Sequence, residues 1–267
     1  MNPEILTYSL GSIDTHLHSR ISCDSEMGLQ AACRHALKLG LKALVFTEHA
    51  DFDPSDQGCG FYDDRKYDEE LAEARVAMGR ALKIYKGVEI TYQPQRRLQI
   101  LEFIHQHQFD FTLGSVHIVG PQDVSRPEPA QKYYGTIEEE QAYGEYFQEV
   151  EKLIDSRLFD CLGHLDLCKR YGHLHFGPLI YRKYEKSFKR LLKRLIQSGM
   201  MLEINTSGLR QQVKETFPPY PAVMEYLKMG GTNLTLGSDA HRTQDVGYAF
   251  EKVLHEIPQL KKLKNIK

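Results

Sequence analysis

The sequence predicts an α/β fold built around a buried, mainly parallel sheet. Seven short runs rich in Val, Ile, Leu, Phe and Thr recur along the chain, and they are too apolar for a sheet with one face in water. Segments with apolar residues at helical spacing lie between them. Because strand and helix alternate, we expect right-handed βαβ units, either in an open, doubly wound sheet or in a closed barrel. The alternation alone leaves both architectures open.

The elements can be assigned in order along the chain. Strands are expected at residues 8–14, 41–48, 83–90, 109–117, 159–165, 200–206 and 233–239. Helical spacing runs through residues 29–37, 71–82, 98–101, 143–154, 191–196 and 224–226. Gly40 and Gly199 mark expected helix ends, and Pro94 and Pro221 mark expected helix starts. Two long polar connections, residues 50–68 and 119–136, are expected to be functional loops over a site.

Composition excludes several classes of protein. The 267 residues carry a formal net charge of −2 with Lys and Arg scattered along the chain, so no basic stripe predicts a nucleic-acid partner. The amino end does not resemble a signal peptide and no segment approaches the length of a membrane span, which favours a cytoplasmic protein. Five cysteines without a C-x-x-C pair argue against a disulfide framework and against a thiolate zinc site.

Each expected strand runs into a motif with ionisable or polar side chains. In chain order these motifs are DTHLH, TEH, GVE, GSVH, GHLD, EIN and GSDAH. The carboxyl ends of parallel strands form the face where ligands bind, and a barrel brings all of them to one mouth. We therefore expect one site that contains His16, His18, Asp24, His49, Glu89, His117, His164, Asp239 and His241.

The composition of this set favours metal ions. His16 and His18 are two residues apart, so in a strand they face the same side, and Asp239 and His241 repeat the spacing. Each motif alone has a structural alternative: a hydrogen-bonded core histidine, a surface glutamate or, for Asp24 or Ser25, an N-cap of a helix near Glu26. Together they suit Zn²⁺, Mn²⁺ or Fe²⁺, and nine ligands imply two or three ions. Such a cluster is typical of phosphate-ester hydrolysis by a metal-bridging hydroxide.

These ordered motifs resemble those of the polymerase-and-histidinol-phosphatase (PHP) superfamily of metal-dependent phosphoesterases. The resemblance implies a distorted (β/α)7 TIM-like barrel in a single catalytic domain over residues 1–267. It also implies three metal positions: the first held by His16, His18, Glu89 and Asp239, the second by Glu89, His117 and His164, and the third by Asp24, His49 and His241. Asp24 stands where several relatives have a histidine.

Three further segments, GHLDLCKRYG, LEINTSGLR and YPAVMEYLKMGGTNLTLGSDAH, are similar to the histidinol-phosphate phosphatase branch. This branch implies hydrolysis of L-histidinol phosphate in histidine biosynthesis. Glu89, Asp239 and His241 would be the catalytic groups, and Asp239 or His241 would protonate the leaving alkoxide. The segment GSVHIVGPQ departs from the aromatic and glycine-rich continuation of many such enzymes. The candidate substrate contacts are Ser115, Lys169, Arg170, Asn205 and Arg210.

Other readings stay open at this point. A PHP phosphoesterase acting on nucleotides or nucleic-acid ends predicts a basic groove or a stacking platform, whereas this chain has no basic bias and no Trp. A noncatalytic metal-binding domain predicts missing ligands, and an amidohydrolase predicts a bridging lysine where Glu89 stands. The favoured partner is a small phosphate ester, without nucleic acid or membrane. An acidic run with Asp51, Asp53, Asp63 and Asp64 either receives the amine of that substrate or is simply solvated.

Overall fold

The chain folds into a seven-stranded parallel sheet whose two outer strands meet. The computed structural model describes residues 1–54, 56 and 58–262. The sheet order is β1, β2, β3, β4, β7, β8 and β9, which are Ile13–Leu17, Ala43–His49, Lys83–Thr91, Phe111–Ser115, Cys161–Leu162, Met201–Asn205 and Leu234–Gly237. At their carboxyl ends β1 and β9 are joined, because His18 N–H donates to Ala240 O (2.9 Å) and Asp239 N–H donates to His16 O (2.8 Å). The sheet is thus nearly closed into a barrel, and the prediction of a TIM-like fold is confirmed.

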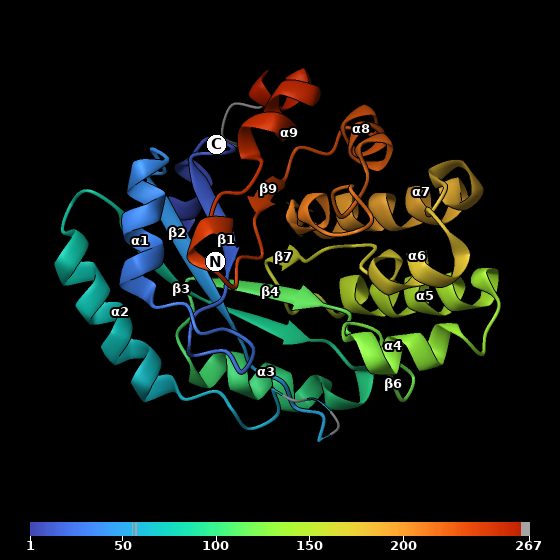
Figure 1. Ribbon diagram of the computed structural model, residues 1–267, viewed down its shortest axis with the longest axis horizontal. Coiled ribbons are helices and arrows are strands. Elements are labelled where there is room, and N and C mark those ends of the chain that lie inside the picture. Colours follow the sequence, from blue (N-terminus) through green and yellow to red (C-terminus); the bar gives the residue numbers. More distant parts are fainter. Residues whose placement is uncertain (55, 57, 263–267) are drawn as a thin grey trace.

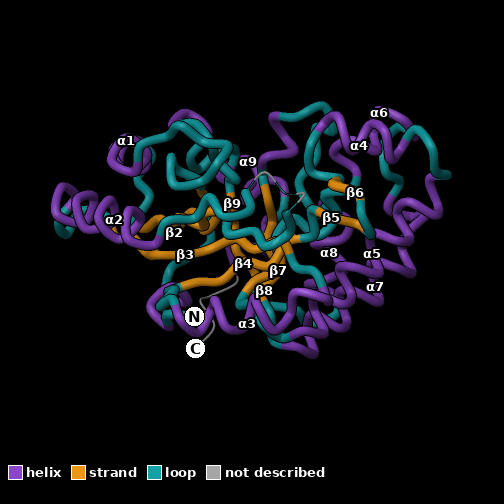
Figure 2. The backbone as a smooth tube through the Cα atoms, turned by 90° about the horizontal axis from the view of Figure 1, so that it is seen from below, coloured by secondary structure: helices purple, strands orange, loops and turns teal. Residues whose placement is uncertain are grey.

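Helices surround the strands, which run through the middle of the molecule (Figures 1 and 2). Figure 1 shows α1 and α2 on one side and the packed pair α5 and α7 on the opposite side. The helices are α1 (Leu29–Lys38), α2 (Asp64–Met78), α3 (Arg97–Gln106), α4 (Pro127–Tyr134), α5 (Glu139–Ser156), α6 (Lys169–Phe176), α7 (Tyr181–Ser198), α8 (Tyr220–Lys228) and α9 (Phe250–Glu256). Short 3-10 helices lie at η1 (Pro3–Thr7), η2 (Pro94–Arg96), η3 (Ser207–Arg210), η4 (Thr243–Asp245) and η5 (Pro258–Lys262).

Two apolar clusters hold this arrangement together. The larger packs the helices onto the outer face of the sheet. The smaller contains residues from six of the strands, together with Ile5 of η1, and includes Ile13, Val45, Tyr85 and Phe111. Residues from so many strands can touch one another only inside the barrel, so this cluster fills the amino end of its interior and leaves the carboxyl end for polar side chains.

The first strand begins later than the sequence predicts. Residues 8–14 were expected to be extended, but β1 starts at Ile13. Gly11 has φ +82° and Ser12 N–H donates to Ser9 O (2.9 Å), so the preceding residues form a turn. The histidine motif is therefore part of the buried strand itself. Its register with β2 shifts between Asp14 and Leu17, and such a bulge re-aims the side chains that follow.

Two other expectations about the connections are corrected. Helix α1 starts at Leu29 with Gly28 as its N-cap, so neither Asp24 nor Ser25 caps it. Residues 119–136 are mostly ordered elements: the hairpin of β5 (Ile118–Val119) and β6 (Gln122–Asp123), followed by α4. Polar residues with Gly120, Pro121, Pro127 and Pro129 suggested a loop there, but Pro127 is the first residue of α4.

Asp14, the first ionisable residue of DTHLH, closes the barrel rather than facing the site. Its buried carboxylate accepts hydrogen bonds from the backbone N–H groups of Ser238 (2.9 Å), Gly247 (2.8 Å) and His16 (3.3 Å). Burial, offset in part by these donors, raises its pKa to about 6. One side chain thus ties β1 to the segments that follow β9.

Replacing Asp14 with Ala is expected to lower the free energy of unfolding by about 3–5 kcal/mol, because buried N–H groups lose their acceptors. Urea unfolding measures the change. Asp155→Ala is the control, since among the described residues this exposed carboxylate pairs with Arg194 at the surface. Its loss is expected to lower the free energy of unfolding by less than about 1 kcal/mol. Equal losses in the two variants would contradict the role of Asp14 in closing the barrel.

Candidate metal centre

The predicted ligands converge at the carboxyl end of the barrel. They come from β1, β2 and β3 and from the segments that follow β1, β4, β7 and β9. His16, His18 and Glu89 are almost completely buried, whereas the side chains of Asp24 and His241 are 44% and 29% exposed. The centre therefore has a closed inner part and an open rim.

The first position is defined by atoms of His16, His18, Glu89 and Asp239. His16 Nε2 lies 3.0 Å from His18 Nε2, and each of these nitrogens lies 3.2 Å from Glu89 Oε2 and 3.6 Å from Asp239 Oδ1. A tetrahedral ion with bonds of about 2.0–2.2 Å separates its ligands by about 3.3–3.6 Å. The spacing of these four atoms fits such an ion.

The second position shares Glu89. Its Oε1 lies 2.9 Å from His164 Nε2 and 3.5 Å from His117 Nε2, and these nitrogens are 3.4 Å apart. Ser115 Oγ donates to the same oxygen at 2.5 Å. Because its two oxygens face different groups of ligands, Glu89 has the geometry of a bridging carboxylate.

The third position lies at the rim. Asp24 Oδ2 is 3.1 Å from His241 Nε2 and 3.6 Å from His49 Nε2. The His18 ring stacks with those of His49 and His241, with ring centroids 4.3 Å apart in each pair. Four potential ligand atoms from His18, Asp24, His49 and His241 lie within 4.8 Å of one another. His49 also belongs to a further group with Asp51 and His117.

The electrostatics place His18, Glu89 and Asp239 in their ligand forms, whereas the carboxylates around His16 and His49 outweigh burial and raise the pKa of both imidazoles. Burial and the positive charges of His49 and His241 lower the pKa of His18 to about 3, so its imidazole is neutral. Burial opposes ionisation of Glu89 and Asp239, but the adjacent histidines hold the pKa of both carboxyls well below their usual values. Divalent cations would supply positive charge to these buried carboxylates in place of the protonated histidines.

Comparison with known families identifies this arrangement. The PHP domain model matches residues 14–207. The chain belongs to the PHP family. Seven of the nine predicted ligands lie inside the match, and two lie beyond it. Those inside are His16, His18, Asp24, His49, Glu89, His117 and His164, and those beyond it are Asp239 and His241.

Relatives of this PHP protein carry consistent names. A Deinococcus radiodurans protein named "probable histidinol-phosphatase" is 30% identical and covers 92% of this chain and 93% of its own length. A Clostridium acetobutylicum protein of the same name is 28% identical, with 90% and 91% covered. The crystal structure of histidinol phosphate phosphatase from Lactococcus lactis, complexed with zinc, L-histidinol and phosphate, matches with a TM-score of 0.82 and 26% identity over 97% of this chain and 95% of that one. The family prediction is confirmed.

A set of residues that the sequence did not predict supports the ligands of the PHP centre. Thr91 Oγ1 lies 2.8 Å from His117 Nδ1, and Ser22 Oγ lies 3.1 Å from His18 Nδ1 while donating to Glu48. Glu203 contacts His16 Nδ1. Glu48 and Glu203 stand in the motifs TEH and EIN, so their strand positions were a usable signal, but which imidazole each would meet depends on the barrel.

The predicted substrate contacts fall into two groups. Ser115 and Asn205 are buried beside the ligands, and Asn205 Nδ2 donates to Glu203 Oε2 (3.2 Å). Lys169 is also buried, but its ammonium pairs with Asp166 (2.9 Å) and donates to Thr216 O (2.8 Å). These contacts give Lys169 a structural role, that of tying α6 to the segment after η3.

The two arginines are more accessible. Arg210 is anchored by hydrogen bonds from its guanidinium to Ser238 O (2.7 Å) and Asp239 O (2.6 Å). Arg170 stacks on the Tyr171 ring at 5.3 Å, and within the described part of the chain it has no carboxylate partner. Arg170 therefore has the freer guanidinium of the two.

The four aspartates of the acidic run, Asp51, Asp53, Asp63 and Asp64, have different partners. Asp63 caps α2, and Asp64 pairs with Lys86 at 2.7 Å. Asp53 accepts from Gln93 (2.9 Å), and Asp51 accepts from Thr91 N–H (3.1 Å). Of these carboxylates, Asp51 is the one grouped with candidate ligands.

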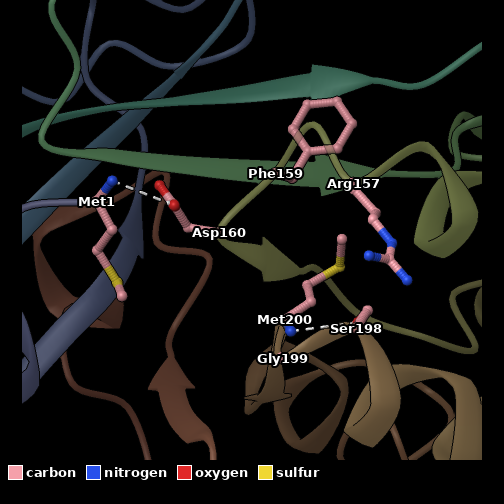
Figure 3. A pocket seen from close by; sticks show the side chains of 7 residues that line it. All are labelled: Met1, Arg157, Phe159, Asp160, Ser198, Gly199 and Met200. Carbon is pink, nitrogen blue, oxygen red and sulfur yellow. Dashed lines mark hydrogen bonds and ion pairs between the residues drawn. The ribbon is translucent and has the colours of Figure 1, made fainter.

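One small pocket lies at the opposite end of the barrel. It has a volume of about 160 Å³ and is lined by residues that precede β7 and β8, with Met1 beside Asp160 (Figure 3): Met1, Arg157, Phe159, Asp160, Ser198, Gly199 and Met200. It contains none of the predicted ligands. Separately, no helix of the described residues is long and apolar enough to cross a membrane.

Proposed function

We propose that this PHP protein hydrolyses L-histidinol phosphate to L-histidinol and inorganic phosphate, with two or three divalent ions (Zn²⁺, Mn²⁺ or Fe²⁺) bound, as a cytoplasmic enzyme of histidine biosynthesis. The observation that carries the proposal is the shared Glu89, whose two oxygens face two adjacent groups of ligand atoms. The names of the relatives and the histidinol and phosphate bound in the Lactococcus lactis structure support the choice of substrate. When bound, the ions supply electrophilic stabilisation of phosphoryl oxygens and acidify water.

The residues of the chain contribute position and charge. His16, His18, Glu89 and Asp239 hold the first ion, Glu89, His117 and His164 the second, and Asp24, His49 and His241 the third. Asp239 has φ +52°, a left-handed conformation that is unfavourable for a residue with a side chain. Arg210 holds the carbonyls of residues 238 and 239 and stabilises this conformation. Asp239 or His241, next to the rim, would protonate the leaving alkoxide with the proton that it takes from the attacking water, because Asp239 is ionised at rest.

Phosphate release by metal-reconstituted protein tests the proposed function. L-histidinol phosphate is compared with sugar phosphates, nucleotides and a nitrophenyl phosphodiester, and Glu89→Gln protein serves as the blank. We expect kcat/KM for histidinol phosphate to exceed the other values by orders of magnitude. A preference for the diester or for nucleotides would overturn the proposed substrate and favour the alternative phosphoesterase.

Replacing Arg170 with Ala is expected to raise KM for histidinol phosphate about 10-fold with little change in kcat, because a charged hydrogen bond to phosphate is made equally in the ground and transition states. Steady-state kinetics measure the effect. Arg182→Ala, which removes an exposed arginine at the start of α7, is the control. An unchanged KM in the Arg170 variant would mean that its guanidinium is merely solvated.

A further inference from the structure

Glu203 is a buried carboxylate to which the proposed function assigns no role. It lies in the middle of β8 and has no exposed surface. Its Oε1 is 2.6 Å from His16 Nδ1, and its Oε2 accepts a hydrogen bond from the backbone N–H of His164 (2.7 Å). One side chain therefore contacts a ligand of the first metal position and the backbone of a ligand of the second.

The contacts around the Glu203 carboxylate fix its position beside His16. Gly237 on β9 faces the carboxylate, and a Cβ atom at this position would overlap Glu203 Oε1 and come within 2.6 Å of His16 Cβ. Asn205 Nδ2 donates to Oε2 at 3.2 Å. The absence of a side chain at Gly237 thus lets Glu203 lie flat between β8 and β1 with both oxygens engaged.

The chemistry of this contact selects one form of His16. A carboxylate only accepts hydrogen bonds, so His16 must donate from Nδ1, which leaves the Nε2 lone pair facing Glu89 and Asp239. A hydroxyl such as that of Thr91 against His117 either donates or accepts and does not impose a tautomer. Within the described residues, Glu203 is the carboxylate that hydrogen-bonds directly to Nδ1 of a ligand histidine, the ring nitrogen that faces away from the metal position.

We propose that Glu203 is a positioning residue of the metal centre: it holds His16 as the Nδ1–H tautomer for the first ion and fixes His164 for the second. The inference rests on the proposed metal centre but not on the identity of the substrate. In a Glu203→Gln variant, the amide NH₂ would meet either His16 Nδ1–H or the N–H of His164, donor against donor. One of the two ligands would lose its support.

Zinc binding by folded protein tests this proposal. Competition with a chromophoric chelator is expected to show affinity about 10–100-fold weaker for at least one ion in Glu203→Gln than in wild type, and the absorption spectrum of the Co²⁺-substituted variant should change. Asp166→Asn is the matched control, because Asp166 is an equally buried carboxylate whose partner is Lys169. Loss of stability alone would lower the melting temperature of either variant without changing the cobalt spectrum.

A measurement on the wild-type protein tests the proposal even if the Glu203→Gln variant does not fold. ¹⁵N-histidine NMR of zinc-loaded wild type should show a proton on Nδ1 of His16. A proton-free Nδ1, or wild-type zinc affinity and an unchanged cobalt spectrum in folded Glu203→Gln, would overturn the proposal. Wild type that binds zinc but does not hydrolyse histidinol phosphate would refute the proposed substrate and leave the role of Glu203 intact.

Discussion

Replacing Glu89 with Gln is expected to lower kcat for histidinol phosphate by about 10³-fold or more, since one preorganised electrostatic group is commonly worth about 10²–10³ and Glu89 serves two metal positions. Its Oε2 lies 3.2 Å from the first pair of histidines, and its Oε1 lies 2.9 Å from His164. Glutamine keeps the shape but loses the negative charge, and its NH₂ group cannot bind a cation. Steady-state phosphate release and metal analysis of the same sample measure the loss.

Glu69→Gln is the control for this variant, because the same substitution is made on the exposed face of α2. There the partner of Glu69 is Arg65 at 3.5 Å. It should retain full turnover and metal content. Near-normal kcat in Glu89→Gln with a full complement of metal would show that Glu89 is not the bridge. Lost turnover together with lost metal, in protein that keeps its circular dichroism spectrum, is the expected pattern.

Removing the metal is expected to abolish hydrolysis and to lower the melting temperature. A ligand present at 1,000 times its Kd stabilises the native state by about 4 kcal/mol, which corresponds to about 8–16 °C for a domain of this size. The physical reason is that the ligand carboxylates of Glu89 and Asp239 are buried and lose the positive charge of the ions. Dialysis against a chelator, followed by calorimetry and a phosphate-release assay, measures both effects.

Restoring the ions one equivalent at a time provides the control for chelation. Activity and melting temperature should return together with Zn²⁺, Mn²⁺ or Fe²⁺, and Glu89→Gln should show a smaller thermal shift. Full activity in protein whose metal content is below detection would contradict the metal-dependent mechanism. Recovery of stability without activity would indicate that the added ion fills the inner positions but does not support turnover.

The sequence predicted much of the candidate centre because parallel strands deliver their carboxyl ends to one face. His16 and His18, His117, His164 and Asp239 were expected together on that ground, and the structure brings their ligand atoms within a few ångströms. Asp14 and Glu203 could not be assigned in this way. Both stand in strand-end motifs, DTHLH and EIN, but Asp14 turns towards β9 and Glu203 reaches across to β1.

Local sequence was also ambiguous at Asp24. Its position before a helical pattern was compatible with an N-cap. The structure shows that it is not one, because α1 begins four residues after Ser25, at Leu29. Asp24 then lies beside His241, which is more than two hundred residues away in the chain. Capping depends on local backbone geometry, whereas this contact depends on closure of the barrel.

The sequence by itself determined the α/β class, the order of the strands and the set of ionisable side chains, because the periodicity of apolar residues and the residue types at strand ends are local properties. Only the tertiary structure decided that the sheet closes, that the two oxygens of Glu89 face different ligand groups, and that Glu203 supports His16. These are relations between strands separated by tens to hundreds of residues. They arise from the twist and closure of the sheet, which no local pattern encodes.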